Sequence, residues 1–165
     1  KIINEYAGLL LQNKVYRGDA IPGIPSLTRV ELFTSEGNGL QAHGKEMSIE
    51  FEIDMPAENI PNMALSFQVF NRLNQAILYN WRFDQEMITA RKKGKNLLRF
   101  TYGSLPLFKG DYYLKVHLAE TKGRNKFMEI ECCPFSVEMI NMKEPEWGWN
   151  EGVCQVLEQG SWEER

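Results

Sequence analysis

Hydrophobic and polar residues alternate with a period of two in several segments of the chain. In the most regular segment, residues 47–55, the odd positions are Met, Ile, Phe, Ile and Met, and the even positions are Ser, Glu, Glu and Asp. Segments 65–69 and 112–118 repeat the pattern, and segment 135–139 repeats it less regularly. Because successive side chains on a strand point to opposite faces, this alternation predicts antiparallel strands with one buried and one solvated face.

Less regular apolar segments predict further strands at 27–34, 76–81, 96–102, 126–132 and 152–157. Between the segments lie turn signals rich in Gly, Pro and Asn, at 36–39, 56, 59–62, 71–74, 93–95, 109–111 and 122–123. Eight or nine short strands with regular turns and no strand–helix alternation are typical of a sandwich or barrel. The chain is therefore predicted to be all-β.

The N-terminal segment has a different pattern. Its apolar residues recur at helical spacing, at Ile2, Ile3, Tyr6, Leu9 and Leu10. This spacing indicates a short amphipathic helix, which Gly8 disfavours. Gly18 and the Pro-Gly-Ile-Pro run at 22–25 mark a turn or linker. We therefore expect a linker segment at 1–25, with or without that helix, and a β-sandwich domain at 26–165.

Length and charge argue against several classes of protein. The 165 residues suit one domain with a sizeable core, and the formal net charge is −3. A nucleic-acid binder usually carries a basic patch, but the one basic cluster, at 91–95, is short and fits a solvated loop. No stretch approaches the roughly 20 apolar residues of a membrane span. The chain begins at Lys1 without a Met or a signal-peptide pattern, so we expect a piece of a larger protein.

The three cysteines predict free thiols. Cys132 and Cys133 are neighbours, and neighbouring side chains on a strand point apart, so the two are not expected to bridge each other; Cys154 leaves an odd count. Free thiols fit a reducing compartment. No Cys-x-x-Cys pair or His cluster has the spacing of a zinc site, and we expect neither a metal nor a cofactor.

A set of short motifs resembles a known family. Residues 107–116 have the form Leu-x-x-Gly-x-Tyr-x-Leu-x-Val, in which Gly turns the chain and a buried Tyr anchors the next strand by its hydroxyl. Further motifs surround it in a fixed order: Leu-Thr-Arg-Val-Glu-Leu at 27–32, Phe-Gln-Val-Phe-Asn-Arg-Leu-Asn-Gln at 67–75, Phe-Ser-Val at 135–137, Gly-Val at 152–153 and Trp162. This ordered set resembles the C-terminal polysaccharide-binding domain of Wzt, the ATPase subunit of bacterial O-polysaccharide ABC transporters. One departure is Asn74-Gln75, where the family often has a Gly.

The resemblance implies an immunoglobulin-like antiparallel β-sandwich that binds its cognate O-antigen polysaccharide and forms a homodimer. It implies a cytoplasmic location at the inner face of the inner membrane, and contact with the membrane-embedded transporter subunit through an ATPase domain. It implies no catalysis here, and the charge balance argues against a nucleic-acid partner. The alternative function is a β-sandwich for protein–protein interaction or dimerisation that binds no glycan. The chain itself contains no Walker motif and no Gly-x-Ser-x-Gly nucleophile elbow, and no local motif indicates a glycosidase carboxylate pair.

Sugar recognition needs flat aromatic rings and planar polar side chains, and two groups of residues offer both. The first is Tyr79, Asn80, Trp81 and Arg82, with Asp84 nearby. The second is the polar side of two predicted strands, Tyr113, Lys115 and His117 with Gln68 and Ser66. The alternatives are that Trp81 is a core residue closing a strand, and that the second group is a solvated sheet face. A lone His such as His117 is more often hydrogen-bonded than catalytic.

The C-terminal segment raises a question of assembly. Trp147 and Trp149 lie in a loop with Gly and Pro, where they pack under the loop, cover an interface or stack on a ligand. The predicted strand at 152–157 follows a connection of about a dozen residues, 140–151, which is long enough to reach a second copy. We expect this strand to be exchanged within a homodimer. The alternative is that it pairs within its own chain.

Overall fold

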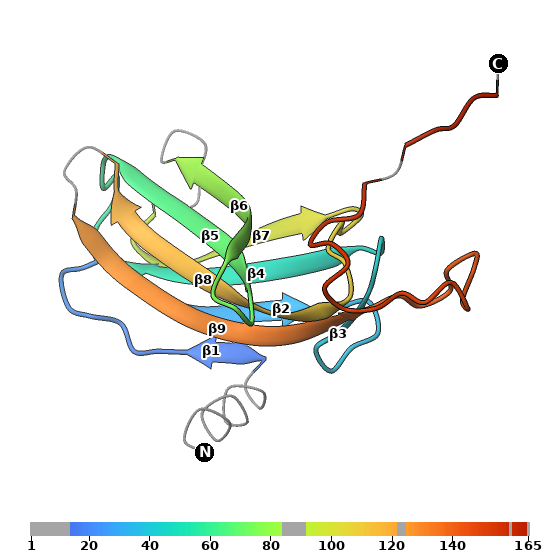
Figure 1. Cartoon of the computed structure of the whole chain (residues 1–165). Coiled ribbons are helices and arrows are strands. Elements are labelled where there is room, and N and C mark those ends of the chain that lie inside the picture. Colours follow the sequence, from blue (N-terminus) through green and yellow to red (C-terminus); the bar gives the residue numbers. More distant parts are fainter. Residues whose placement is uncertain (1–13, 84–91, 122–124, 159, 165) are drawn as a thin grey trace.

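The computed structural model describes residues 14–83, 92–121, 125–158 and 160–164. Two β-sheets pack face to face across this part of the chain (Figure 1). The predicted all-β sandwich is therefore confirmed. The predicted helix at 1–13 lies outside the described residues, and the described ones contain no helix that could cross a lipid bilayer.

Nine strands build the described part of the two sheets. They are β1 Val15–Arg17, β2 Ser26–Phe33, β3 Leu40–Ala42, β4 Met47–Met55, β5 Met63–Asn71, β6 Ala76–Phe83, β7 Gly94–Tyr102, β8 Gly110–Glu120 and β9 Lys126–Glu138. The small sheet has the order β1-β2-β4-β7 and the large sheet the order β3-β9-β8-β5-β6. Neighbouring strands are antiparallel except β3 and β9, which are parallel.

The core fills the space between the sheets and explains the alternation in the sequence. Every odd residue of β4 and β5 is buried, and so are the even residues of β8 from Tyr112 to Leu118. Phe51 and Phe67 meet at the centre with ring centroids 5.7 Å apart, and Phe67 contacts Phe100 of β7 edge-on at 5.1 Å. The hydrophobic stripes of both sheets thus share one core, as the period-two pattern predicts.

The structure corrects three strand predictions. The segments 126–132 and 135–139 belong to one strand, β9, which continues through a bulge at Cys133, where φ is +52°. The three-residue strands β1 and β3 were not predicted, because three residues are too few to show a period. The predicted strand at 152–157 is wrong: its ladder pairing is a single bridge between Val156 and Leu107 of the same chain.

Asparagines shape the hairpin between β5 and β6. Asn74, where the resembled family often has Gly, adopts φ of +59°, a conformation that Asn tolerates better than most residues. The buried Asn71 accepts hydrogen bonds at Oδ1 from the backbone N–H groups of Leu73 and Gln75, at 2.9 and 3.0 Å. Asn74 in place of the family's Gly is therefore compatible with a tight hairpin. This hairpin fixes the register of β6 against β5.

The predicted tyrosine anchor is present at the start of β8. The buried hydroxyl of Tyr112 donates to the carbonyl of Phe108 at 2.8 Å, and burial raises the pKa of Tyr112 to about 12. This bond ties β8 to the turn that precedes it. The same turn also receives the C-terminal segment, because Phe108 N–H donates to the carbonyl of Gln155 at 3.0 Å.

We predict that Tyr112→Phe destabilises the domain by about 1–3 kcal/mol, because the buried Phe108 carbonyl loses its partner. Urea denaturation followed by circular dichroism measures the change. Tyr79→Phe is the matched control, since Tyr79 is 55% exposed and its hydroxyl is not buried in the core. Equal stability of the two variants would contradict an anchoring role for Tyr112.

Candidate functional site

The register of the large sheet gathers most of the predicted binding residues on one surface. Outward side chains form two rows across β6, β5, β8 and β9, namely Trp81, Ser66, His117 and Glu129 in one row and Tyr79, Gln68, Lys115 and Glu131 in the next. Phe70 and Tyr113 lie opposite each other farther along the same face. We call these ten residues the polar–aromatic face.

Six of the eight predicted residues therefore belong to a single surface: Gln68, Tyr79, Trp81, Tyr113, Lys115 and His117. The two groups that the sequence suggested separately are joined because β6 pairs directly with β5. Glu129 and Glu131 were not predicted as site residues. Their signal was the alternation of two glutamates with Met128 and Ile130 in β9, which marks them as outward-facing.

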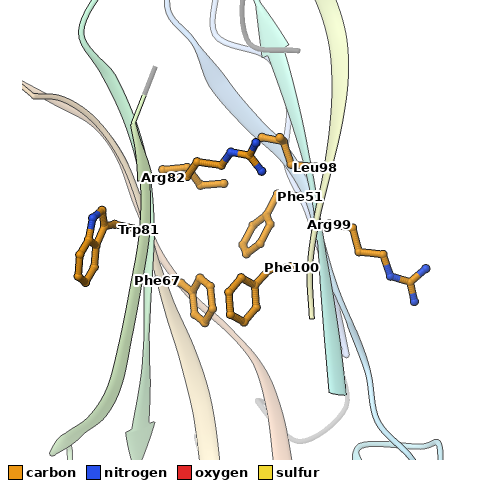
Figure 2. A pocket seen from close by; sticks show the side chains of 8 residues that line it. Phe51, Phe67, Trp81, Arg82, Leu98, Arg99 and Phe100 are labelled. Carbon is orange, nitrogen blue, oxygen red and sulfur yellow. The ribbon is translucent and has the colours of Figure 1, made fainter. Parts of the chain in front are cut away.

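Asn80 and Arg82 lie on the opposite side of β6. The Asn80 side chain donates to the Tyr102 hydroxyl at 2.6 Å, and burial raises the pKa of Tyr102 to about 12. Arg82 helps to line a small cavity of about 50 Å³ between the sheet edges, together with Phe67 and Phe100. Figure 2 shows Arg82 extending into this gap and Trp81 pointing away from it. The first predicted group thus divides between two faces, and Asp84 lies outside the described residues.

Two aromatic pairs flank the polar centre of the polar–aromatic face. Tyr79 and Trp81, on the edge strand β6, have ring centroids 5.3 Å apart, and Phe70 and Tyr113 are stacked at 5.5 Å. Tyr79 and Trp81 are 55% and 56% exposed, so the interpretation of Trp81 as a core residue is wrong. Large rings left this exposed are available to a ligand or partner.

The centre of the face is a set of paired charges. The Lys115 ammonium lies 3.3 Å from a carboxylate oxygen of Glu129 and 3.3 Å from one of Glu131, and 5.7 Å from the centre of the Phe70 ring. Lys126 also pairs with Glu129. Hydrogen bonds from Lys126 and then Lys115 lower the pKa of Glu129 to about 2, and both glutamates raise the pKa of Lys115.

His117 links the two halves of the face. One ring nitrogen, Nε2, lies 3.3 Å from Gln68 Oε1, and the other, Nδ1, lies 3.2 Å from Glu129 Oε2. Burial lowers the pKa of His117 and outweighs the nearby Glu129 carboxylate, which raises it. A neutral imidazole carries a single N–H, and both neighbouring atoms are oxygens, so the neutral ring donates a hydrogen bond to one of the two only.

The outer face of the small sheet has a different character. Arg29 pairs with Glu31 at 2.6 Å and with Glu50 at 3.2 Å, and Arg99 pairs with Glu50 at 3.6 Å. Lys95 pairs with Glu52 on the same face. This face is a solvated lattice of ion pairs without the exposed Tyr and Trp rings of the polar–aromatic face.

The C-terminal segment packs at one end of the sandwich. Trp149 donates from Nε1 to the carbonyl of Glu144, and its ring lies 6.3 Å from that of Phe108, so Trp149 packs under its loop. Trp147 is 75% exposed. A polar cavity of about 170 Å³ at this end is lined by the hairpin at 71–73, the turn at 109–112 and the segment at 151–155.

Among the described residues there is no group of three His, Cys, Asp or Glu side chains placed to hold a metal ion. The three cysteines are free thiols, as predicted, with Cys132 and Cys133 buried and Cys154 partly exposed. The described acids of the polar–aromatic face, Glu129 and Glu131, are both paired with Lys115.

Comparison with known proteins concerns the fold. No protein-family profile matches the chain, and no curated protein matches its sequence. The structure is similar to the crystal structure of the C-terminal domain of wzt, with a TM-score of 0.60 and 8% identity over 93% of this chain and 89% of that one. The resemblance inferred from the sequence is therefore confirmed at the level of the fold.

Two further likenesses have lower scores. A Niemann-Pick type C2 protein from Japanese carpenter ant matches with a TM-score of 0.48 and 9% identity over 74% of this chain and 99% of that one. The CARDB domain of a Pyrococcus furiosus protein matches with a TM-score of 0.44 and 14% identity over 73% of this chain and 95% of that one. Likenesses this weak say nothing about function.

We predict that His117 makes the domain less stable as the pH falls below about 6.5. Its pKa is lower in the folded than in the unfolded chain, so the unfolded chain takes up the proton first and stability is lost as the pH falls from about 6.5 through the folded-state pKa. Urea denaturation at about pH 7.5 and about pH 5 compares the wild type with His117→Gln, which cannot titrate. The wild type should lose more stability, and parallel losses would contradict the prediction. Both proteins contain the other histidine, His43, so the difference between their stabilities reports on His117.

Proposed function

We propose that this chain is a non-catalytic carbohydrate-binding domain that holds an O-antigen polysaccharide on the polar–aromatic face. One observation carries the proposal: an exposed aromatic pair, Tyr79 with Trp81, and a half-buried one, Phe70 with Tyr113, share a single open sheet face with a polar, hydrogen-bonding centre. Aromatic rings pack against the C–H faces of pyranose rings, and planar polar groups bond their hydroxyls. The outer face of the small sheet has Phe33 as an exposed ring, but the Arg99 guanidinium lies over it, 5.2 Å from its centre, and that face has no pair of exposed rings among the described residues.

The shape of the face suits a polymer. The outward rows cross four strands, which span about 14 Å at the usual strand spacing. Tyr79 and Trp81 lie on the edge strand β6, so a chain lying along either row can continue past the sheet. A ligand pocket for a small molecule would instead be enclosed on most sides.

The chemistry of the face is suited to binding rather than catalysis. A general acid near neutral pH needs a raised pKa, whereas the pKa of Glu129 is lowered to about 2. His117 is neutral and hydrogen-bonded within the face. These groups can accept and donate hydrogen bonds, but they are poorly placed to deliver a proton to a glycosidic oxygen.

The O-antigen assignment rests on the sequence motifs, and the fold agrees with it. The ordered sequence motifs resemble the Wzt family, and the fold is similar to the C-terminal domain of wzt. On this proposal the domain acts at the cytoplasmic face of the inner membrane, joined to a transporter ATPase whose membrane subunit exports the glycan.

We predict that Trp81→Ala weakens binding of the polysaccharide from the strain that encodes this chain by at least about tenfold, which is about 1.4 kcal/mol. Loss of an exposed stacking ring removes contact area without disturbing the core. Isothermal titration calorimetry measures the affinity, and the length of the recovered glycan shows whether it has been cut.

Leu97→Ala is the matched control for Trp81→Ala, because Leu97 is 51% exposed on the outer face of the small sheet. It should bind like the wild type. Unchanged affinity of Trp81→Ala would move the site away from the polar–aromatic face, and shortened glycan would overturn the non-catalytic assignment.

A homodimer joined through the C-terminal segment is part of the proposal. The segment contacts the body of its own chain through few bonds, chiefly Phe108 N–H to Gln155, Leu157 N–H to Pro106 and the Arg72–Glu151 pair at 2.7 Å. Trp147 and Val153 are 75% and 69% exposed at the same end. A lightly held segment with exposed apolar residues favours docking onto a second copy, by exchange or side by side.

Truncation before Gly152 should convert the dimer to a monomer in sedimentation equilibrium, because it removes the proposed contact. Trp162→Ala is the control within the same segment, since Trp162 is fully exposed beyond the last backbone contacts and its loss should leave the dimer intact. A full-length domain that remains monomeric at high concentration would contradict the proposed dimer.

A further inference from the structure

We infer that the ligand of the polar–aromatic face is an uncharged stretch of polysaccharide, and that the pairing of Lys115 with Glu129 and Glu131 excludes charged glycans. This inference rests on the proposed function, since it names the chemical class of glycan that the same face accepts. It follows from how charge is distributed over the described residues of that face.

The charges at the centre of the face cancel. Lys115 and Lys126 supply two cations, and Glu129 and Glu131 supply two carboxylates. Each lysine contacts at least one of these carboxylates, and His117 lies between Glu129 and Gln68 as a neutral ring. Among the residues described there, no cation lacks a carboxylate partner.

The rest of the same face adds no unpaired cation among its described residues. At the end near the β5–β6 hairpin, Lys109 pairs with Glu138 at 3.0 Å, and Asp111 accepts a hydrogen bond from Ser136 at 2.6 Å. Asp111 therefore leaves this end slightly negative. A glycan that carries carboxylate or phosphate groups would meet either neutral pairs or an acid.

A charged group that binds at the centre of the face would meet a like charge. An anionic group can reach the third N–H of Lys115, but it then lies beside the carboxylates of Glu129 and Glu131. A cationic sugar that contacts either glutamate likewise lies beside Lys115. Like charges brought together at an interface disfavour binding, so either arrangement costs affinity that an uncharged sugar keeps.

Uncharged hydroxyls can use the pairs as they stand. The Lys115 ammonium has three N–H groups, of which the two contacts with Glu129 and Glu131 occupy two. Each carboxylate oxygen has a second lone pair, and the Gln68 amide adds a donor and an acceptor. The ion pairs fix these groups in place, so a hydroxyl meets oriented donors and acceptors without meeting net charge.

The first test titrates the wild-type domain with a panel of O-polysaccharides, including the one from its own strain, that carry no charge, carboxylate groups or phosphate groups. The bound member should be neutral. Its Kd should change less than about threefold between low and high salt, because no net charge is neutralised on binding. Oxidising its primary hydroxyls to carboxylates should weaken binding at least about tenfold.

The second test changes the charge of the face. Glu129→Gln with Glu131→Gln leaves Lys115 and Lys126 without carboxylate partners on this face and should strengthen binding of the oxidised glycan about tenfold relative to the wild type. Glu50→Gln with Glu52→Gln removes two paired carboxylates from the other sheet and is matched in net charge. It should bind the oxidised glycan as weakly as the wild type.

The outcomes separate the two proposals. If a charged glycan binds best and Trp81→Ala abolishes its binding, the carbohydrate function stands and the neutral-glycan inference is overturned. If no member of the panel binds, including the polysaccharide of the same strain, both are overturned. The wild-type titrations decide the inference even if the double glutamate variant does not fold.

Discussion

The register of β5 between β6 and β8 is the constraint on which the candidate site depends. Side chains on a strand alternate between faces, so a slip of one residue would bury Gln68 and expose Phe67. The core prevents this slip, because the Phe67 ring packs between the sheets against Phe51 and Phe100. Local bonds strengthen this constraint at the end of the pairing where Asn71 lies opposite Tyr112: Asn71 closes the hairpin to β6, and Tyr112 anchors the start of β8. Packing on one side of the sheet thus places the binding groups on the other.

The sequence predicts one half of the polar–aromatic face well. In 65–69 and 112–118 the apolar stripe is continuous, so the outward positions of Gln68, Tyr113, Lys115 and His117 can be assigned from the alternation alone. Segment 76–81 reads Ala-Ile-Leu-Tyr-Asn-Trp, in which alternation fails, so the outward direction of Trp81 could not be inferred. A strand at the edge of a sheet is less buried on its inner side. Its sequence therefore alternates less clearly between hydrophobic and polar residues.

The bulge at Cys133 explains a different failure. Before it, the even residues Met128 and Ile130 face inward, and after it the odd residues Phe135 and Val137 do. A residue with φ of +52° lets both Cys132 and Cys133 be buried, so the inward parity changes within one continuous strand. A period-two analysis interprets such a change as a gap between two strands. The period-two pattern also does not show that Glu129 and Glu131 share a face with Lys115. The pairing of β8 with β9 shows this.

Ion pairs occur on the outer faces of both sheets, but their surroundings differ. On the small sheet, ion pairs such as Arg29 with Glu50 connect neighbouring strands on a face whose described residues include no exposed Tyr or Trp ring. On the large sheet, the ion pairs of Lys115 share a face with two aromatic pairs, Tyr79 with Trp81 on the edge strand β6 and Phe70 with Tyr113. Pairing there cancels the net charge at the centre of the face and leaves one Lys115 N–H and further carboxylate lone pairs for a ligand. A sheet face can in this way offer many hydrogen-bonding groups to the hydroxyls of a polymer and still carry no net charge.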